Sequence, residues 1–183
     1  LARARVNAGE FDRVLDDFAS VKLNDAAAQG RLLGAVADAY LGKANVAEAI
    51  KVYQQALELR PNDAEAGIGL ARARLFSREP AIAEETVRAV IAHSPDNGAA
   101  YATLFDVLQM QGKTEEAIAA MEEAVRLQPD QVAYHYTLIS HLFRSGRPDD
   151  ATARFAAMKK LAPNNTSTRY LQAFIDARAG RLP

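Results

Sequence analysis

Four prolines recur every 34 residues along this chain of 183 residues, and a polar residue pair follows each one. They are Pro61, Pro95, Pro129 and Pro163. Proline disfavours the helical conformation in the residue before it, and an Asn or Asp beyond it can cap the next helix by accepting backbone N–H hydrogen bonds. The spacing therefore predicts that one helix ends and another begins every 34 residues.

Placing each proline at position 32 of a 34-residue unit defines four complete units. These are 30–63, 64–97, 98–131 and 132–165. Position 20 of every unit is alanine, and position 24 carries a larger side chain. The alanines are Ala49, Ala83, Ala117 and Ala151, and the larger residues are Tyr53, Val87, Met121 and Phe155. Position 27 carries Ala56, Val90, Ala124 and Met158. Positions 20, 24 and 27 are three, four or seven residues apart, which places them on one face of a helix.

Position 15 marks the expected break between two helices of a unit. It is occupied by Ala44, Arg78, Gly112 and Gly146. Glycine favours such a break because it adopts positive φ without steric cost. Pro80 and Pro148 both stand at position 17, in the expected first turn of the second helix, where a missing N–H costs nothing. Each unit is therefore predicted to be two helices joined by a short turn.

The pattern continues toward both ends of the chain. Residues 1–29 are predicted to form a partial unit, with one extra residue in a loop near 22–29. Leu1 falls at position 7 of that unit, as Leu70 does in its own, so the pentapeptide LARAR recurs because both copies have the same place in a repeat. Residues 166–183 are predicted to form the first helix of a further unit.

The two incomplete units raise the question of what covers them. A single helix pair cannot bury its own apolar face, whereas stacked pairs can. We expect either that the chain belongs to a longer array or that its bare ends pair with another copy of the chain. Leu171 and Ile175 are expected on the uncovered side of the last helix.

This register and these residue types resemble the tetratricopeptide repeat (TPR) family. The resemblance is clearest in unit 30–63, where the signature positions carry Leu33, Val36, Ala37, Tyr40, Ala49, Tyr53, Ala56 and Pro61. It implies an all-α fold of about eleven helices, a right-handed superhelical solenoid of antiparallel helix pairs, forming a single array over residues 1–183. Phe105 and Ile139 at position 8, and Arg74 at position 11, depart from the family pattern and indicate looser or shifted local packing.

Composition and motifs argue against several functions. The net charge is −1 and cysteine is absent, so nucleic-acid binding and thiolate metal sites are not expected. No apolar run approaches the ~18 residues of a membrane helix, so we expect no membrane insertion by this segment. His93 is expected to be a partly buried helix residue, and His135 and His141 are six residues apart, on different helical faces. We therefore expect no metal, no cofactor and no catalytic site.

The TPR resemblance implies that a protein or peptide partner binds in the concave groove, at positions 2, 5, 9, 12 and 13 of each unit. We call these the groove positions. The candidate binding residues are Tyr136, Phe143, Arg144, Tyr170, Phe174, Arg178, Arg72, Asp106 and Gln109. Aromatic side chains beside arginine are typical of binding hot spots, although the same rings could pack between units. The Lys and Asn of the family's chaperone-tail clamp are missing, since Gly34 and Asp38 stand there in unit 30–63.

Three classes of function follow from this pattern. The first is a binding scaffold, the second is a structural spacer or self-assembling rod, and the third is an enzyme, for which no set of residues converges. The Ala- and Arg-rich sequence and the stretch 169–182 resemble bacterial TPR proteins of exopolysaccharide and protein-sorting systems, including PEP-CTERM-associated TPR lipoproteins. That resemblance implies a periplasmic, lipid-anchored parent protein, and a cytoplasmic TPR adaptor is the alternative.

Overall fold

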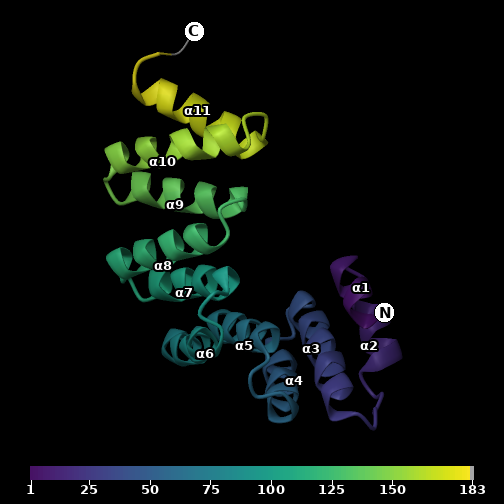
Figure 1. Cartoon of the computed structure of the whole chain (residues 1–183). Helices are drawn as coiled ribbons and strands as arrows, with labels where there is room; N and C mark the ends of the chain where they lie inside the picture. Colours follow the sequence, from purple (N-terminus) through teal and green to yellow (C-terminus); the bar gives the residue numbers. More distant parts are fainter. Residues whose placement is uncertain (182–183) are drawn as a thin grey trace. The chain divides into compact units, whose positions relative to one another are not determined.

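The computed structural model describes residues 1–181, which fold into α-helices joined by short turns (Figure 1). They divide into two compact units, Leu1–Asp96 and Asn97–Pro183. The first holds α1 (Ala2–Asn7), α2 (Phe11–Phe18), α3 (Ala26–Gly42), α4 (Val46–Leu59), α5 (Ala64–Phe76) and α6 (Pro80–His93). The second holds α7 (Gly98–Met110), α8 (Thr114–Leu127), α9 (Val132–Arg144), α10 (Pro148–Leu161) and α11 (Thr166–Arg178). No strand occurs in the described residues, which confirms the all-α class; Leu182, in the tail stretch, lies outside them.

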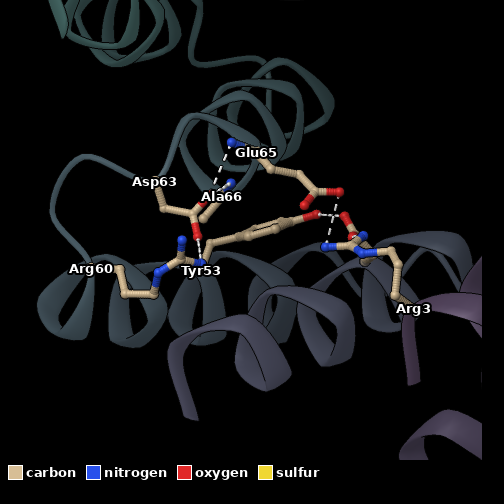
Figure 2. A network of polar contacts seen from close by, with 7 residues as sticks. Arg3, Tyr53, Arg60, Asp63, Glu65 and Ala66 are labelled. Carbon is tan, nitrogen blue, oxygen red and sulfur yellow. Dashed lines mark hydrogen bonds and ion pairs between the residues drawn. The ribbon is translucent and has the colours of Figure 1, made fainter. Parts of the chain in front are cut away.

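Polar residues after the repeated prolines begin the first helix of each repeat. The Asp63 side chain accepts hydrogen bonds from the backbone N–H groups of Glu65 and Ala66, at 3.1 and 3.2 Å (Figure 2). Asn97 and Asn165 cap α7 and α11 in the same way. Gln131, at the same position before α9, makes no side-chain cap. The predicted caps are thus confirmed where the residue is Asn or Asp, whose short side chain reaches the free N–H groups.

The turns at position 15 adopt the left-handed conformation that the spacing predicts. Gly112 and Gly146 have φ of 74° and 78°. Ala44 and Arg78 take φ of 58° and 59° at the same point, which is costly for a residue with a side chain. The turn geometry is therefore imposed by the helix pair and not by glycine alone. Pro80 and Pro148 begin α6 and α10, as expected.

The predicted close crossing at position 20 forms the centre of each helix pair. All four alanines at this position have no exposed surface, and the four larger residues at position 24 are also buried. Gly69 of α5 lies so close to the Tyr53 ring that a Cβ at this glycine would stand 2.4 Å from two of its carbons. The large ring at position 24 therefore requires a small residue on the facing helix. Phe105 and Ile139, which depart from the family pattern at position 8, are both buried in the core.

The loop expected near residues 22–29 is shorter than the sequence predicts. The helix α3 begins at Ala26, and the Asp25 side chain accepts a hydrogen bond of 2.6 Å from the Ala28 N–H. Three alanines and a glutamine follow this cap, and these residue types favour a helix. The helix therefore starts four residues before the repeat boundary at residue 30.

The expectation for the last helix is wrong. Leu171 and Ile175 are buried in the structure, with α11 packed on α10 and α9. They stand at positions 6 and 10, on the side of α11 that packs against the preceding helices. Positions 7 and 11 lie on a neighbouring side of the helix, where Lys159 of α10 donates a 2.8 Å hydrogen bond to the position-7 side chain. Those two positions carry Gln172 and Asp176, whose side chains are linked by a 2.8 Å hydrogen bond, and Arg181 also binds Asp176 at 3.0 Å. The side of α11 that carries Gln172 and Asp176 is therefore polar.

The close crossing in α8 yields a stability prediction. Ala117 is completely buried, while Ala119 on the same helix is exposed. We expect Ala117→Leu to overpack the crossing and to lower the free energy of unfolding by about 1–3 kcal/mol. Ala119→Leu is the matched control and should change stability little. Thermal and urea unfolding followed by circular dichroism measures both, and equal losses would show that the repeat register is wrong.

Candidate partner-binding pocket

Side chains at the groove positions of α9 and α11 come together around one pocket, which we call the aromatic pocket. Its volume is about 420 Å³. It is lined by Tyr136, Thr137, Ser140, Phe143, Arg144, Tyr170, Leu171 and Phe174. The helix α10 lies between α9 and α11 in the chain and packs on both, and equivalent positions on α9 and α11 lie next to each other. The pocket is open enough to admit a side chain from outside.

Two pairs of aromatic rings form the wall of the aromatic pocket. The Phe143 and Phe174 rings meet edge to face, with centroids 5.1 Å apart. The Tyr136 and Tyr170 rings are tilted, with centroids 6.5 Å apart. Both distances lie in the range of favourable aromatic contacts. The spacings of seven residues in α9 and four in α11 thus build one continuous aromatic surface.

The exposure of these rings fits both of the roles that the sequence leaves open. Tyr136, Phe143 and Phe174 are half-buried, and Tyr170 is 59% exposed. The rings therefore pack between α9 and α11 and also present area to the pocket. Packing between α9 and α11 fixes the positions of the rings.

Two arginines stand at the edge of the aromatic pocket. The Arg178 guanidinium carbon lies 5.8 Å from the Phe143 ring centroid and 5.9 Å from that of Phe174, within cation–π range. Arg144 is exposed, and its Nη2 lies 3.4 Å from Nδ1 of His141. The pocket thus combines an apolar wall with positive charge.

The other predicted binding residues lie elsewhere. Asp106 and Gln109 are on α7, where Asp106 is exposed and Gln109 half-buried, and neither lines the aromatic pocket. Arg72 is exposed on α5, in the first compact unit. Thr137 and Leu171 line the pocket although both stand at position 6, outside the groove positions. The sequence signal for them is their adjacency to the tyrosines at position 5.

In the first compact unit, three groove positions carry Arg3, Asp38 and Glu65, which form an internal polar network. Figure 2 shows Arg3, Tyr53 and Glu65 converging from α1, α4 and α5. Arg3 forms an ion pair with Asp38 and a second one of 3.1 Å with Glu65, and the buried Tyr53 hydroxyl donates to Asp38. Burial, and then the Asp38 charge, raise the pKa of Tyr53, so this hydroxyl keeps its proton. These groups satisfy one another and leave few polar partners for a ligand.

Neither a candidate metal-ligand cluster nor a candidate membrane-spanning helix is found in residues 1–181. Within residues 1–181, no cluster of three or more His, Asp or Glu side chains could hold a metal. No helix in that part of the chain combines the length and apolar character needed to cross a bilayer. The expectation for His93 is wrong, because this residue is exposed at the end of α6 and only its Nδ1 contacts the Ala89 carbonyl, at 2.9 Å.

His141 lies directly beneath the arginine edge of the aromatic pocket. It is buried, meets the Phe105 ring edge to face at 5.2 Å, and has no hydrogen-bond partner for its buried Nε2. Burial, and then the charge of Arg144, lower the pKa of His141. The folded chain therefore holds this imidazole in its neutral form, in which Nδ1 can accept from Arg144.

This burial predicts how stability depends on pH. A histidine with a lowered pKa in the folded state binds fewer protons there than in the unfolded chain. Its contribution to stability is present above the unfolded pKa of about 6.5 and is lost as the pH falls through the lower folded value. Melting temperatures between pH 7.5 and 5 should fall less for His141→Gln than for the native chain. A native pH dependence of the melting temperature in His141→Gln would contradict the prediction.

Comparison with known proteins identifies the fold. The family model described as tetratricopeptide repeat matches residues 40–108 and 108–175. No curated protein matches the chain in sequence. Solved structures that are similar include MamA from Desulfovibrio magneticus RS-1, with 24% identity, a TM-score of 0.71 and coverage of 90% of this chain and 93% of that chain. A second MamA crystal structure has 20% identity and a TM-score of 0.70, and the match covers 89% of this chain and 88% of that chain. MamA of AMB-1 has 18% identity and a TM-score of 0.69, and the match covers 90% of this chain and 96% of that chain.

At these identities the likeness to the MamA structures concerns the fold alone. The family match has a different weight, because it extends over most of the chain and includes the aromatic pocket. Its two segments join at residue 108, inside α7, and together run from α3 to α11. The chain therefore belongs to the tetratricopeptide repeat family.

Proposed function

We propose that this chain is a non-catalytic scaffold that binds a segment of a partner protein through the aromatic pocket. The observation that carries the proposal is the pair of Phe rings at α9 and α11, which are held by mutual packing and still line a pocket of about 420 Å³. Membership of the TPR family supports a protein partner. A bulky apolar side chain of that partner, aromatic or aliphatic, occupies the pocket.

The chemistry of the pocket favours binding over catalysis. Its polar side chains are Thr137, Ser140, the two tyrosine hydroxyls and Arg144. None of these is a serine or cysteine paired with a base, which a nucleophilic mechanism needs. Burying an aromatic anchor against four rings, in contrast, is the arrangement that supplies most of the energy at protein interfaces.

The proposal predicts the outcome of a peptide selection. The chain is immobilised and exposed to a phage-displayed library of random peptides, and recovered sequences should contain a bulky apolar residue. Replacing Ser140 by Trp fills the pocket and should abolish that enrichment. Ala119→Trp, on the exposed side of α8, is the matched control and should leave the enrichment intact.

The recovered peptides then allow the anchor energy to be measured. Calorimetry with Phe143→Ala or Phe174→Ala should show a loss of about 2 kcal/mol, roughly thirtyfold in affinity. Circular dichroism run in parallel separates binding from folding. If both variants melt normally and keep native affinity, the aromatic pocket is not the binding site; if both melt several degrees lower, the rings act as core residues.

Two further roles stay predictions. A structural role through end-to-end self-association is testable by sedimentation at increasing concentrations of the chain. Participation in an envelope or exopolysaccharide assembly rests on the sequence resemblance of the tail and of the Ala- and Arg-rich composition. The full-length gene distinguishes a periplasmic lipoprotein, which carries a lipoprotein signal upstream, from a cytoplasmic adaptor, which lacks one.

A further inference from the structure

The arginines of the second compact unit fall into two groups by their partners. Four of the seven form ion pairs with carboxylates. They are Arg126, Arg147, Arg154 and Arg181. Arg144 and Arg178, which border the aromatic pocket, and Arg169 on the other side of α11 have no carboxylate partner within residues 1–181. The charges at the pocket are thus left without the neutralisation that most others have.

The contacts of these two arginines leave their hydrogen-bond donors available. The Arg178 guanidinium lies over the Phe143 and Phe174 rings within cation–π range, and this contact uses none of its N–H groups as hydrogen-bond donors to oxygen or nitrogen. Arg144 has one contact of 3.4 Å, to the neutral His141. Each guanidinium presents a planar fork that matches a carboxylate. The nearest acid on α11, Asp176, is already bound by Gln172 and Arg181.

We infer that the partner segment carries acidic side chains beside its bulky apolar anchor, placed to pair with Arg144 and Arg178. The inference rests on the proposed function and adds the chemistry of the partner. The apolar residue enters between the rings of α9 and α11, and the flanking Asp or Glu residues reach the guanidinium groups at the pocket edge. Charge complementarity of this kind contributes specificity and faster association as well as affinity.

A selection with defined flanks tests the inference. The library presents a fixed central Phe with two randomised residues on each side, fused to the coat protein through the peptide C-terminus, so that no free terminal carboxylate is available. Asp and Glu should be enriched at the flanks relative to the unselected library, and Lys and Arg depleted. If the fully random library is enriched in apolar anchors but the fixed-Phe library is enriched in neutral or basic flanks, the inference is overturned and the proposed function stands. If neither library is enriched more by the native chain than by the Ser140→Trp variant, the inference and the proposed function are both overturned.

Arginine variants test which positive charges bind the acidic flanking residues. The double variant Arg144→Gln with Arg178→Gln should bind an enriched acidic peptide about fivefold or more weakly, and should lose the acidic preference in the selection. Raising NaCl from about 0.05 to about 0.5 M should weaken native binding and affect the double variant less, because salt screens exposed charge pairs. An unchanged salt dependence in the double variant contradicts the inference.

Two controls separate charge from structure. Arg169→Gln removes an arginine that is also exposed and without a carboxylate partner on α11, but that does not line the aromatic pocket, so peptide affinity should not change. Arg178→Lys keeps the charge and removes the planar stacking group, so the acidic preference should persist. Loss of that preference in Arg178→Lys together with a lowered melting temperature would mean that Arg178 acts by holding the rings, and would overturn its assignment as a partner-binding charge.

Discussion

The structure depends on the close crossing of two helices at an alanine. Each helix pair has one apolar face, and a pair alone cannot cover it, so the face must pack against a neighbouring helix. The two helices can approach closely only if the side chain at position 20 is small. The four alanines at this position are completely buried. The larger side chain at position 24 then fills the space toward the next helix. Tyr53 shows the consequence, because its ring requires a glycine, Gly69, on the facing helix.

Repetition of this crossing brings equivalent positions of successive first helices next to one another. In the second unit, this places position 5 of α9 beside position 5 of α11, and the two tyrosines there pair. Phe143 and Phe174 stand at positions 12 and 9. Their rings also meet, although these positions differ by three residues, which is about one helical turn. The proposed binding surface therefore arises from the same spacing that builds the core. Its chemistry depends only on which side chains occupy the groove positions.

The two compact units use their groove positions differently. In the first unit, Arg3, Asp38 and Glu65 bind one another across three helices, so their charges are largely neutralised within the fold. In the second compact unit, Arg178 lies beside the rings and Arg144 beside His141, and neither has a carboxylate partner within residues 1–181. Side chains that are already paired must break contacts to bind a ligand, whereas unpaired arginines beside rings gain contacts. This difference is the physical reason for proposing a binding site at α9 and α11.

The sequence by itself determined the all-α class, the helix pairs and their turns, because Pro61 and its equivalents, the position-20 alanines and the position-15 breaks act through local backbone chemistry. It also indicated the aromatic and arginine residues of α9 and α11 from their helical spacing. Tertiary packing decided the rest. It buried Leu171 and Ile175 against the preceding repeat and left His93 exposed. It also decided that the rings pack together and still line a pocket, since half-burial depends on the distance between two helices, which no spacing within one helix can specify.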